Sequence, residues 1–285
     1  MVKGIILDVD GVLVGEKIGY NSPYPHPDVL ARLKAIKAKG ILISLCTAKP
    51  YYAVQPIIEG ASLRNLHITE GGAVIIDSID DVILKTHLID KTLAKQAVQI
   101  YLDAGVYVEA YALNEYLVDK SQVSGLTETH AHILQTEPRV VDSLPEAIDD
   151  LEICKVMPVA KNQADKPRLI ELFEPFKDKL TLSWGVHRIA LPHQFGIITA
   201  KGISKQQATL EVARYNRIKP EELLGIGDST SDWQFMEQCG YAATLANGSD
   251  QLKQLVVTKK DRSYIGGSVD SNGVLSIFDY FGLLV

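Results

Sequence analysis

This chain of 285 residues has few cysteines, no long apolar segment and no excess of positive charge. Its three cysteines, Cys46, Cys154 and Cys239, are too few for a disulfide framework, and we expect them to be small buried hydrophobic residues. No apolar run approaches membrane-spanning length and no apolar signal segment is present, so we expect a cytoplasmic protein. A net charge of −6 disfavours nucleic acid and membrane lipids as partners.

The composition predicts a globular chain. Hydrophobic residues make up 46% and charged residues 22% of the sequence, and both values are close to the average for folded proteins. The length leaves room for one large domain or two medium ones, and we find no internal repeat or low-complexity segment. Composition leaves the oligomeric state open between a monomer and a homodimer.

The first predicted strand ends in two acidic residues. Residues 2–7 (V-K-G-I-I-L) are mostly aliphatic and predict a buried strand, and Asp8 and Asp10 follow it before a turn at Gly11. In open α/β sheets, ligands bind outside the carboxyl ends of the strands. Because two close carboxylates repel each other, we expect a positive partner between them.

A second predicted strand brings a hydroxyl group to the same edge. A helix begins at Pro27 and ends at Gly40, and the apolar strand 41–46 that follows ends at Thr47. A strand, a helix and a second strand of this kind form a right-handed parallel unit. Asp8 and Thr47 are therefore predicted at one edge of a parallel sheet.

The middle of the chain differs from its two ends. Residues 78–185 mix helices with alternating, half-exposed strands, which indicates an α+β domain whose sheet is covered on one side. Strand and helix then alternate again, with a helix at 201–215 and a buried strand at 223–226. The sequence thus predicts an α/β fold, with a discontinuous parallel-sheet core (1–77 and 186–285) and a smaller α+β domain.

Four small polar clusters end core strands or begin core helices, namely Asp8-x-Asp10, Thr47, Lys201 and Asp228-x-x-x-Asp232. Seen alone, each has a structural explanation, because such residues often cap helices, form turns or are solvated. Together they bring carboxylates, a hydroxyl and an ammonium group to one sheet edge. This combination indicates chemistry at that edge.

The oxygen ligands of this set favour magnesium and phosphate. Mg²⁺ usually takes one or two carboxylates with water and phosphate oxygens, so Asp8 and Asp228 are candidates to share one ion. An ionised Asp8 can attack phosphorus and form an aspartyl-phosphate, while Thr47 and Lys201 stabilise the equatorial oxygens. Asp10 points the same way as Asp8 on an extended segment, and it can protonate the leaving alkoxide and later activate water.

In its motifs the chain resembles the haloacid dehalogenase superfamily of phosphohydrolases. The similar segments are D-V-D-G-V at 8–12, Thr47 at a strand end, Lys201, and G-D-S-T-S-D at 227–232. The long interval between the second and third of these resembles the Cof-type branch, which inserts an α+β cap there. The N-G-V segment at 272–274 is similar to that branch as well, whereas Lys49 stands where the branch usually has arginine.

The resemblance implies a three-layer Rossmann-like core with a cap at 78–185. It implies that Asp8 is the nucleophile, Asp10 the general acid and base, and that Thr47 and Lys201 bind the phosphoryl group. Mg²⁺ would be held by Asp8, the backbone carbonyl of Asp10 and Asp228, and Asp232 would support the metal or the lysine. The expected activity is hydrolysis of a small phosphorylated metabolite under a closing cap, with a sugar phosphate suggested only by the resemblance.

Two rival functions stay open on sequence alone. A phosphotransferase or mutase would share the aspartyl-phosphate and pass it to a second hydroxyl instead of water. A non-catalytic sensor would keep the fold and only bind a ligand. Release of phosphate without an added acceptor separates hydrolysis from transfer, and the presence of both Asp8 and Asp10 speaks against a sensor.

Several further polar residues have no assigned role in the sequence. Lys205 lies one helical turn after Lys201 and could reach a phosphate, but the sequence favours a solvated or ion-paired lysine. His187 belongs to the return from the second domain, as a substrate contact or a hinge. His130 and His132 share no acidic partner that would indicate a metal site. One further group, which shares a face of a predicted strand, consists of Tyr107, Glu109 and Tyr111.

Overall fold

The computed structural model describes residues 1–80 and 82–283, and its central feature is a parallel sheet. The described strands of this sheet follow the order β14 (Ser263–Gly266), β13 (Tyr241–Leu245), β12 (Leu223–Ile226), β1 (Gly4–Leu7) and β2 (Leu42–Leu45). All neighbouring pairs are parallel. Because β1 lies between β12 and β2, the segments that follow these three strands meet at one edge.

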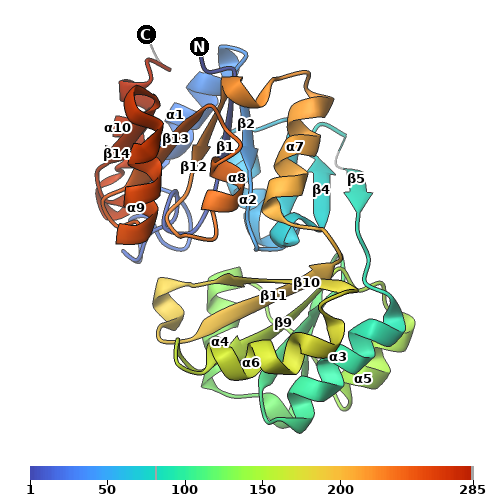
Figure 1. Cartoon of the computed structure of the whole chain (residues 1–285). Coiled ribbons are helices and arrows are strands. Elements are labelled where there is room, and N and C mark those ends of the chain that lie inside the picture. The colour runs from blue at the N-terminus through green and yellow to red at the C-terminus, as the bar shows by residue number, and fades with distance from the viewer. Residues whose placement is uncertain (81, 284–285) are drawn as a thin grey trace.

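Helices cover both faces of the parallel sheet (Figure 1). One face packs against α1 (Pro27–Ala38), α2 (Tyr51–Gly60) and α10 (Val274–Tyr280). The other packs against α7 (Lys205–Tyr215), α8 (Trp233–Met236) and α9 (Asp250–Val256). In β1, Ile5 and Leu7 face the first layer and Ile6 the second, all fully buried, and each contributes about 1.5–3 kcal/mol of hydrophobic stabilisation. The predicted three-layer α/β core is confirmed.

A small antiparallel sheet continues the core beyond β2. It consists of β3 (Leu66–Thr69), β4 (Val74–Asp77) and β5 (Val82–Thr86). An isolated parallel bridge between Cys46 and Ile68 links it to the end of β2. β4 pairs antiparallel with β5, and residue 81, which lies between them in the sequence, is outside the described residues.

A second, mainly antiparallel sheet builds the cap. Within the described chain its order is β10 (Leu180–Gly185), β11 (Gln194–Ala200), β9 (Lys155–Ala160), β6 (Tyr107–Tyr111), β7 (Tyr116–Asp119) and β8 (Arg139–Val141). One face packs against α3 (Lys91–Asp103), α5 (Leu144–Ala147) and α6 (Lys166–Phe173). The other face packs against α4 (Gly125–Leu134) and the core (Figure 1).

The cap sheet extends past the predicted boundary at residue 185. β11 pairs with β9 and β10, so residues 194–200 belong to the cap sheet and not to the core. At the other boundary, β5 pairs with β4 and stays with the core. The correction has a simple cause: no helix separates β10 from β11, and the chain folds straight back on itself as an antiparallel strand.

Two expectations about the chain as a whole can be compared with the structure. All three cysteines are buried free thiols, as predicted. In the part of the chain that the structure describes, no helix has both the length and the apolarity needed to cross a membrane.

Candidate active site

Asp8 leaves β1 at the edge where β12 and β2 also end. Its backbone N–H donates to the Ile226 carbonyl at 2.9 Å, and the Val9 N–H donates to its Oδ1 at 2.8 Å. Lys205 Nζ lies 3.2 Å from the same oxygen. Burial raises the pKa of Asp8 to about 7, although the Lys205 charge opposes this change. The carboxylate is therefore fixed in orientation, and the effect of burial on its pKa outweighs that of the Lys205 charge.

Asp10 lines the same cavity but has different partners. Its Oδ1 lies 2.8 Å from Lys49 Nζ and 3.2 Å from His187 Nε2. Burial disfavours its ionised form, yet the charges and hydrogen bonds of Lys49 and His187 outweigh burial and hold the pKa of Asp10 well below its usual range. The residue type is the same at Asp8 and Asp10, but their different neighbours shift the pKa values of the two carboxyl groups in opposite directions.

Thr47 lies where predicted, at the end of β2 and against the cavity. It is buried, and its Oγ1 accepts a hydrogen bond from the Lys49 N–H at 3.1 Å. An oxygen that accepts from the backbone keeps its own hydrogen available as a donor. The short turn from Thr47 to Lys49 therefore presents one hydroxyl and one ammonium group to the same space.

Lys201 does not reach this site. It is exposed, it follows the end of β11, and its Nζ donates to the Lys177 carbonyl. Helix α7 begins at Lys205 and not at 201, since Gly202 has a positive φ of 77° and Ser204 is the N-cap, accepting from the Gln207 N–H. Lys205 therefore occupies the position expected of Lys201. The Ser204-x-x-Gln207 pattern, a capping signature, would have located the helix start.

Lys205 bridges two of the predicted acidic residues. Its Nζ lies 2.8 Å from Asp232 Oδ1 and 3.2 Å from Asp8 Oδ1. Burial disfavours its charge, but Asp232 and Asp8 outweigh burial and hold the pKa of Lys205 well above its usual value. The cation is therefore permanently charged and held beside the Asp8 carboxylate.

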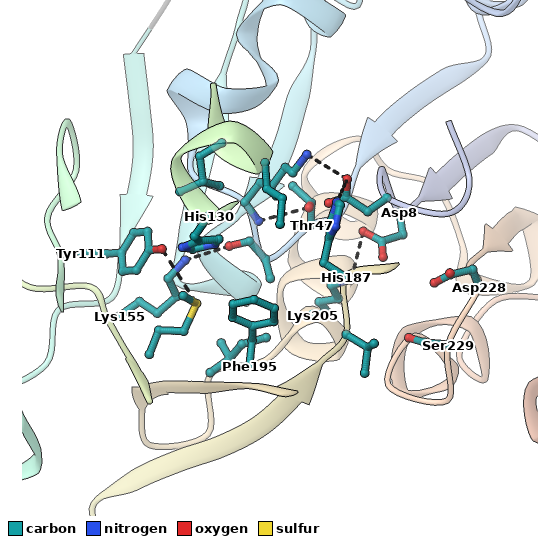
Figure 2. Close-up of a pocket in the computed structure, with 18 residues that line it drawn as sticks. Asp8, Thr47, Tyr111, His130, Lys155, His187, Phe195, Lys205, Asp228 and Ser229 are labelled. Carbon is teal, nitrogen blue, oxygen red and sulfur yellow. Dashed lines mark hydrogen bonds and ion pairs between the residues drawn. The ribbon is translucent and has the colours of Figure 1, made fainter. Parts of the chain in front are cut away.

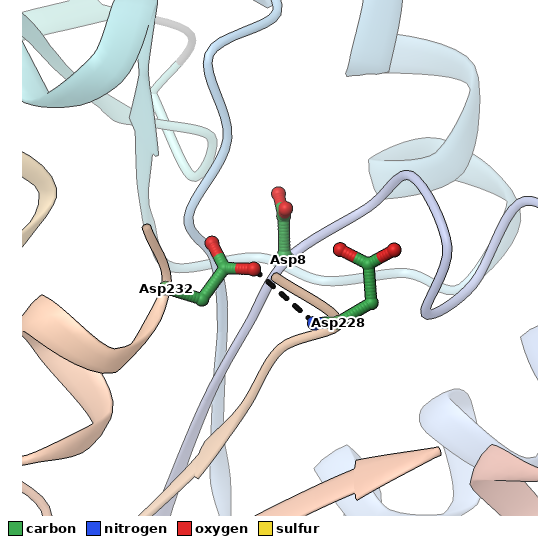
Figure 3. Close-up of side chains that lie close together, drawn as sticks. All are labelled: Asp8, Asp228 and Asp232. Atoms are coloured by element: carbon green, nitrogen blue, oxygen red, sulfur yellow. Dashed lines mark hydrogen bonds between the residues drawn. The ribbon is translucent and has the colours of Figure 1, made fainter. Parts of the chain in front are cut away.

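The loop after β12 is organised by Asp232. Oδ2 of Asp232 accepts from the backbone N–H groups of Asp228 (3.2 Å) and Ser229 (3.1 Å), as Figure 3 shows for Asp228. Gly11 allows the loop to approach: its φ is +74°, and a Cβ there would lie 2.0 Å from Asp228 Oδ2. Burial, together with Asp232 and Asp8, raises the pKa of Asp228 well above its usual value.

The acidic cluster fits a divalent cation. One ligand oxygen from each of Asp8, Asp228 and Asp232 lies within 4.8 Å of the others (Figure 3). Hard carboxylate oxygens are the ligands that Mg²⁺ prefers. Burial and the neighbouring carboxylates raise the pKa values of Asp8 and Asp228, so further positive charge at this place would favour their ionised forms. Both oxygens of Asp232 already accept hydrogen bonds, so Asp232 is better placed to support the loop and Lys205.

Asp8, Asp10, Thr47, Lys205 and Asp228 line one end of a cavity of about 90 Å³ between core and cap (Figure 2). Asp8, Asp228 and Ser229 come from the core, while His130, Tyr111 and other residues of the cap line the opposite end. Lys49 was not predicted as a site residue, and the signal for it was its place two residues after Thr47. His187 was considered only as a substrate contact or a hinge, and its contact with Asp10 was not predicted.

A model of the haloacid dehalogenase-like hydrolase family matches residues 5–278. The chain belongs to this family. As a haloacid dehalogenase-like hydrolase it has curated relatives of similar length that are named as phosphatases. A phosphoglycolate phosphatase of Staphylothermus marinus is 23% identical over 93% of this chain and 94% of the relative. An HMP-PP phosphatase of Serratia proteamaculans is 22% identical over 90% and 88%. The prediction of a phosphatase enzyme is confirmed at this level.

The fold of this haloacid dehalogenase-like hydrolase is shared with solved structures. A sugar phosphatase of HAD subclass IIB superposes with a TM-score of 0.80 over 99% of this chain and 100% of that one, at 19% sequence identity. At this identity the likeness concerns the fold alone. It confirms the predicted arrangement of a Rossmann-like core with an inserted cap.

Proposed function

We propose that this protein is a Mg²⁺-dependent phosphatase that hydrolyses a small phosphorylated metabolite through an aspartyl-phosphate on Asp8. One observation carries the proposal: Asp8 and Asp10 line one cavity with Asp228, Lys49 and Lys205, under a cap. Two carboxylates with separate partners can take the separate roles of nucleophile and proton carrier. Lysines and hydroxyls around them match the needs of a phosphoryl group.

In the first half-reaction, a carboxylate oxygen of Asp8 attacks phosphorus, and the bond between phosphorus and the ester oxygen breaks. The Val9 N–H and Lys205 orient the Asp8 carboxylate for this attack. Thr47 and Lys205 stabilise the equatorial oxygens, where the transition-state charge gathers. Lys205 takes over the phosphate-binding role expected of Lys201, because it lies 3.2 Å from the nucleophile and Lys201 points elsewhere.

Asp10 carries the proton in both half-reactions. It protonates the leaving alkoxide, and afterwards it takes a proton from the water that attacks the aspartyl-phosphate, which releases phosphate and restores Asp8. Lys49 and His187 keep Asp10 ionised before substrate binds. A phosphate bound near Lys49 and His187 adds negative charge beside Asp10 and raises its pKa. Substrate binding therefore favours the acid form of Asp10.

The metal would be held by Asp8, Asp228 and the backbone carbonyl of Asp10. When bound, it keeps Asp8 ionised and neutralises charge on the phosphoryl oxygens. Asp232 positions the Asp228 loop and Lys205. Since both Asp8 and Asp228 have raised pKa values, Mg²⁺ is expected to displace protons from the site.

The substrate is expected to be small because the site is covered. The cap strands β9 and β11 and the loop at His187 line the cavity opposite the core edge, which disfavours a protein-sized phosphate ester. Relatives and neighbours carry names with different substrates, including phosphoglycolate and a sugar phosphate. The sugar phosphate suggested by the resemblance remains a prediction.

The test is phosphate release by purified protein with Mg²⁺ from p-nitrophenyl phosphate and from a panel of phosphorylated metabolites, without an added acceptor. Asp8→Asn is expected to lower kcat by about 10⁴-fold or more, since it removes the nucleophile with little change in shape. Circular dichroism checks that the variant is folded. Near-normal turnover by folded Asp8→Asn protein would contradict the mechanism, and product formation only with an added alcohol would indicate a transferase.

A further inference from the structure

The cap end of the cavity is mainly apolar. Its lining outside the phosphate end includes the apolar side chains of Ile133, Leu134, Met157, Phe195 and Ile197. They come from α4, β9 and β11, the surface of the cap that faces the core (Figure 2). A leaving group that reaches this end therefore contacts mostly carbon.

Two polar residues at this end are already fully engaged. Lys155 Nζ lies 2.5 Å from Glu70 Oε2, donates to the Ala48 carbonyl at 2.9 Å and lies 3.5 Å from the centre of the Tyr111 ring. The Tyr111 hydroxyl donates to Glu109 Oε2 at 2.6 Å. Neither the Lys155 ammonium group nor the Tyr111 hydroxyl hydrogen can be donated to a substrate without breaking a buried contact.

His130 is the exception. It lies in α4 and is almost completely buried, yet it lines the cavity. Its ring stacks on Phe195, with centroids 5.1 Å apart and planes 28° apart, and its Nδ1 lies 2.9 and 3.0 Å from the two carboxylate oxygens of Glu109. Among residues 1–80 and 82–283, no group forms a hydrogen bond with its Nε2.

Glu109 fixes which ring nitrogen carries hydrogen. The carboxylate is fully buried and also accepts from the hydroxyls of Tyr107 and Tyr111. Burial disfavours its charge, but His130 and these hydrogen bonds outweigh burial and lower the pKa of Glu109. Because an ionised carboxylate only accepts, Nδ1 must be the donor toward it. Nε2 is then the ring atom left for an occupant of the cavity.

We propose that His130 is a specificity-determining residue, whose Nε2 binds one hydroxyl group on an otherwise apolar leaving group of the phosphate ester. A hydroxyl both donates and accepts, so it matches Nε2 whichever charge the ring carries. The stack on Phe195 and the apolar lining suit a ring or a branched carbon chain. This inference rests on the proposed function and names the substrate class for the same site.

The same lining disfavours a polyhydroxylated leaving group. Each hydroxyl placed against Ile133, Met157 or Phe195 loses its water without gaining a hydrogen-bond partner, which disfavours binding. A sugar phosphate with several such hydroxyls is therefore expected to bind worse than an aromatic ester with one.

The test compares three esters: benzyl phosphate, 3-(hydroxymethyl)benzyl phosphate and glucose 6-phosphate. Wild-type protein with Mg²⁺ is expected to favour the hydroxylated aromatic ester over benzyl phosphate by about three- to tenfold in kcat/KM, the value of one hydrogen bond. His130→Phe keeps a ring against Phe195 and removes Nε2, so this ratio should fall to about one. His132→Phe, on the exposed side of the same helix, should keep the wild-type ratio.

Glu109 acts through His130 as a positioning residue, and Glu109→Gln separates that role from a structural one. The amide no longer demands a donor at Nδ1, so the preference for the hydroxylated ester is expected to shrink in the same direction as in His130→Phe. Circular dichroism and the urea midpoint report whether the fold is retained. A lower midpoint with an unchanged ester ratio would assign Glu109 a structural role and overturn its part in the proposal.

Binding to Asp8→Asn protein keeps this inference separate from the proposed function. Isothermal calorimetry with the same esters measures affinity without turnover, and His130→Phe in that background should remove the preference for the hydroxymethyl group. An equal preference in both proteins, or tighter binding of glucose 6-phosphate, would overturn the inference. Absence of turnover by wild-type protein with the binding preference intact would overturn the proposed function alone.

Discussion

The two ends of the cavity hold their charges in different ways. At the core end, Asp8 and Asp10 have separate cations, Lys205 and Lys49, and the acidic cluster still lacks positive charge. At the cap end, the buried carboxylate of Glu109 is satisfied by His130 and two tyrosine hydroxyls. Under the proposed function, the core end would receive a metal and a phosphate, whereas at the cap end the Nε2 atom of His130 is left for an occupant of the cavity.

Under the proposed function, this difference assigns the reaction to the core end of the cavity and the choice of substrate to the cap end. Groups with unmet charge can change their protonation and partners during a reaction, and those groups belong to the core. The cap groups are held by contacts that a reaction does not need to break, and they present a fixed surface to the leaving group. Lys155 lies between the two ends and joins them, because it belongs to β9 of the cap and pairs with Glu70 of the core.

The largest effect on stability is expected from breaking the ion pair between Lys155 and Glu70. Lys155→Met leaves Glu70 buried without its cation, and loss of one partner of a buried ion pair costs about 3–5 kcal/mol. The urea midpoint should fall accordingly. Lys155→Met combined with Glu70→Gln removes the orphaned charge and should recover much of the loss. If the double variant were no more stable than the single one, the ion pair would not join the two ends.

A second effect tests whether the core end depends on Lys205. Lys205→Met removes the cation 3.2 Å from Asp8 and is expected to lower kcat by about 10²–10³-fold, as for loss of one group that stabilises a transition-state charge. Lys201→Met is the matched control, since Lys201 is exposed and bonded to Lys177, and it should keep near wild-type kcat. Initial rates with p-nitrophenyl phosphate and Mg²⁺ measure both. The opposite order would return the phosphate-binding role to Lys201.

The smallest expected effect is on the pH dependence of stability, through Glu109 at the cap end of the cavity. The pKa of Glu109 is lower in the folded protein than its ordinary value of 4.5, so this group favours the folded state above that pH. As pH falls below 4.5, the unfolded chain takes up the proton first and the contribution is lost. Urea midpoints of wild-type and Glu109→Gln protein should therefore converge as the pH is lowered from about 5 to about 3. A constant difference would argue against an ionised Glu109.

The core end was largely predictable because its signals are local. Residues 2–7 predict a buried strand on their own, and Asp8, Asp10 and Thr47 follow strand ends, where the topology of a parallel sheet gathers them. Lys201 lies outside the site for a local reason too. The helix begins only after Ser204, so a lysine placed one turn earlier points away from the site.

The cap end was less predictable because its contacts join distant segments. No local signal pairs His130 with Glu109, and the two meet only because α4 packs on β6. His187 reaches Asp10 across 177 positions of sequence. The apolar segment 194–200 carries no mark of which sheet it joins, and only pairing with β9 and β10 decides this.

The junction of β11 with α7 has a mechanical consequence. The turn 201–204 connects the last residue of a cap strand to Lys205, and a chain spans at most about 3.5 Å per residue. A large swing of the cap about this turn would pull on the helix end that holds the cation beside Asp8. The cap sheet and Lys205 are therefore joined by one short turn, and a cap movement that displaces residue 205 would change the charge balance at Asp8.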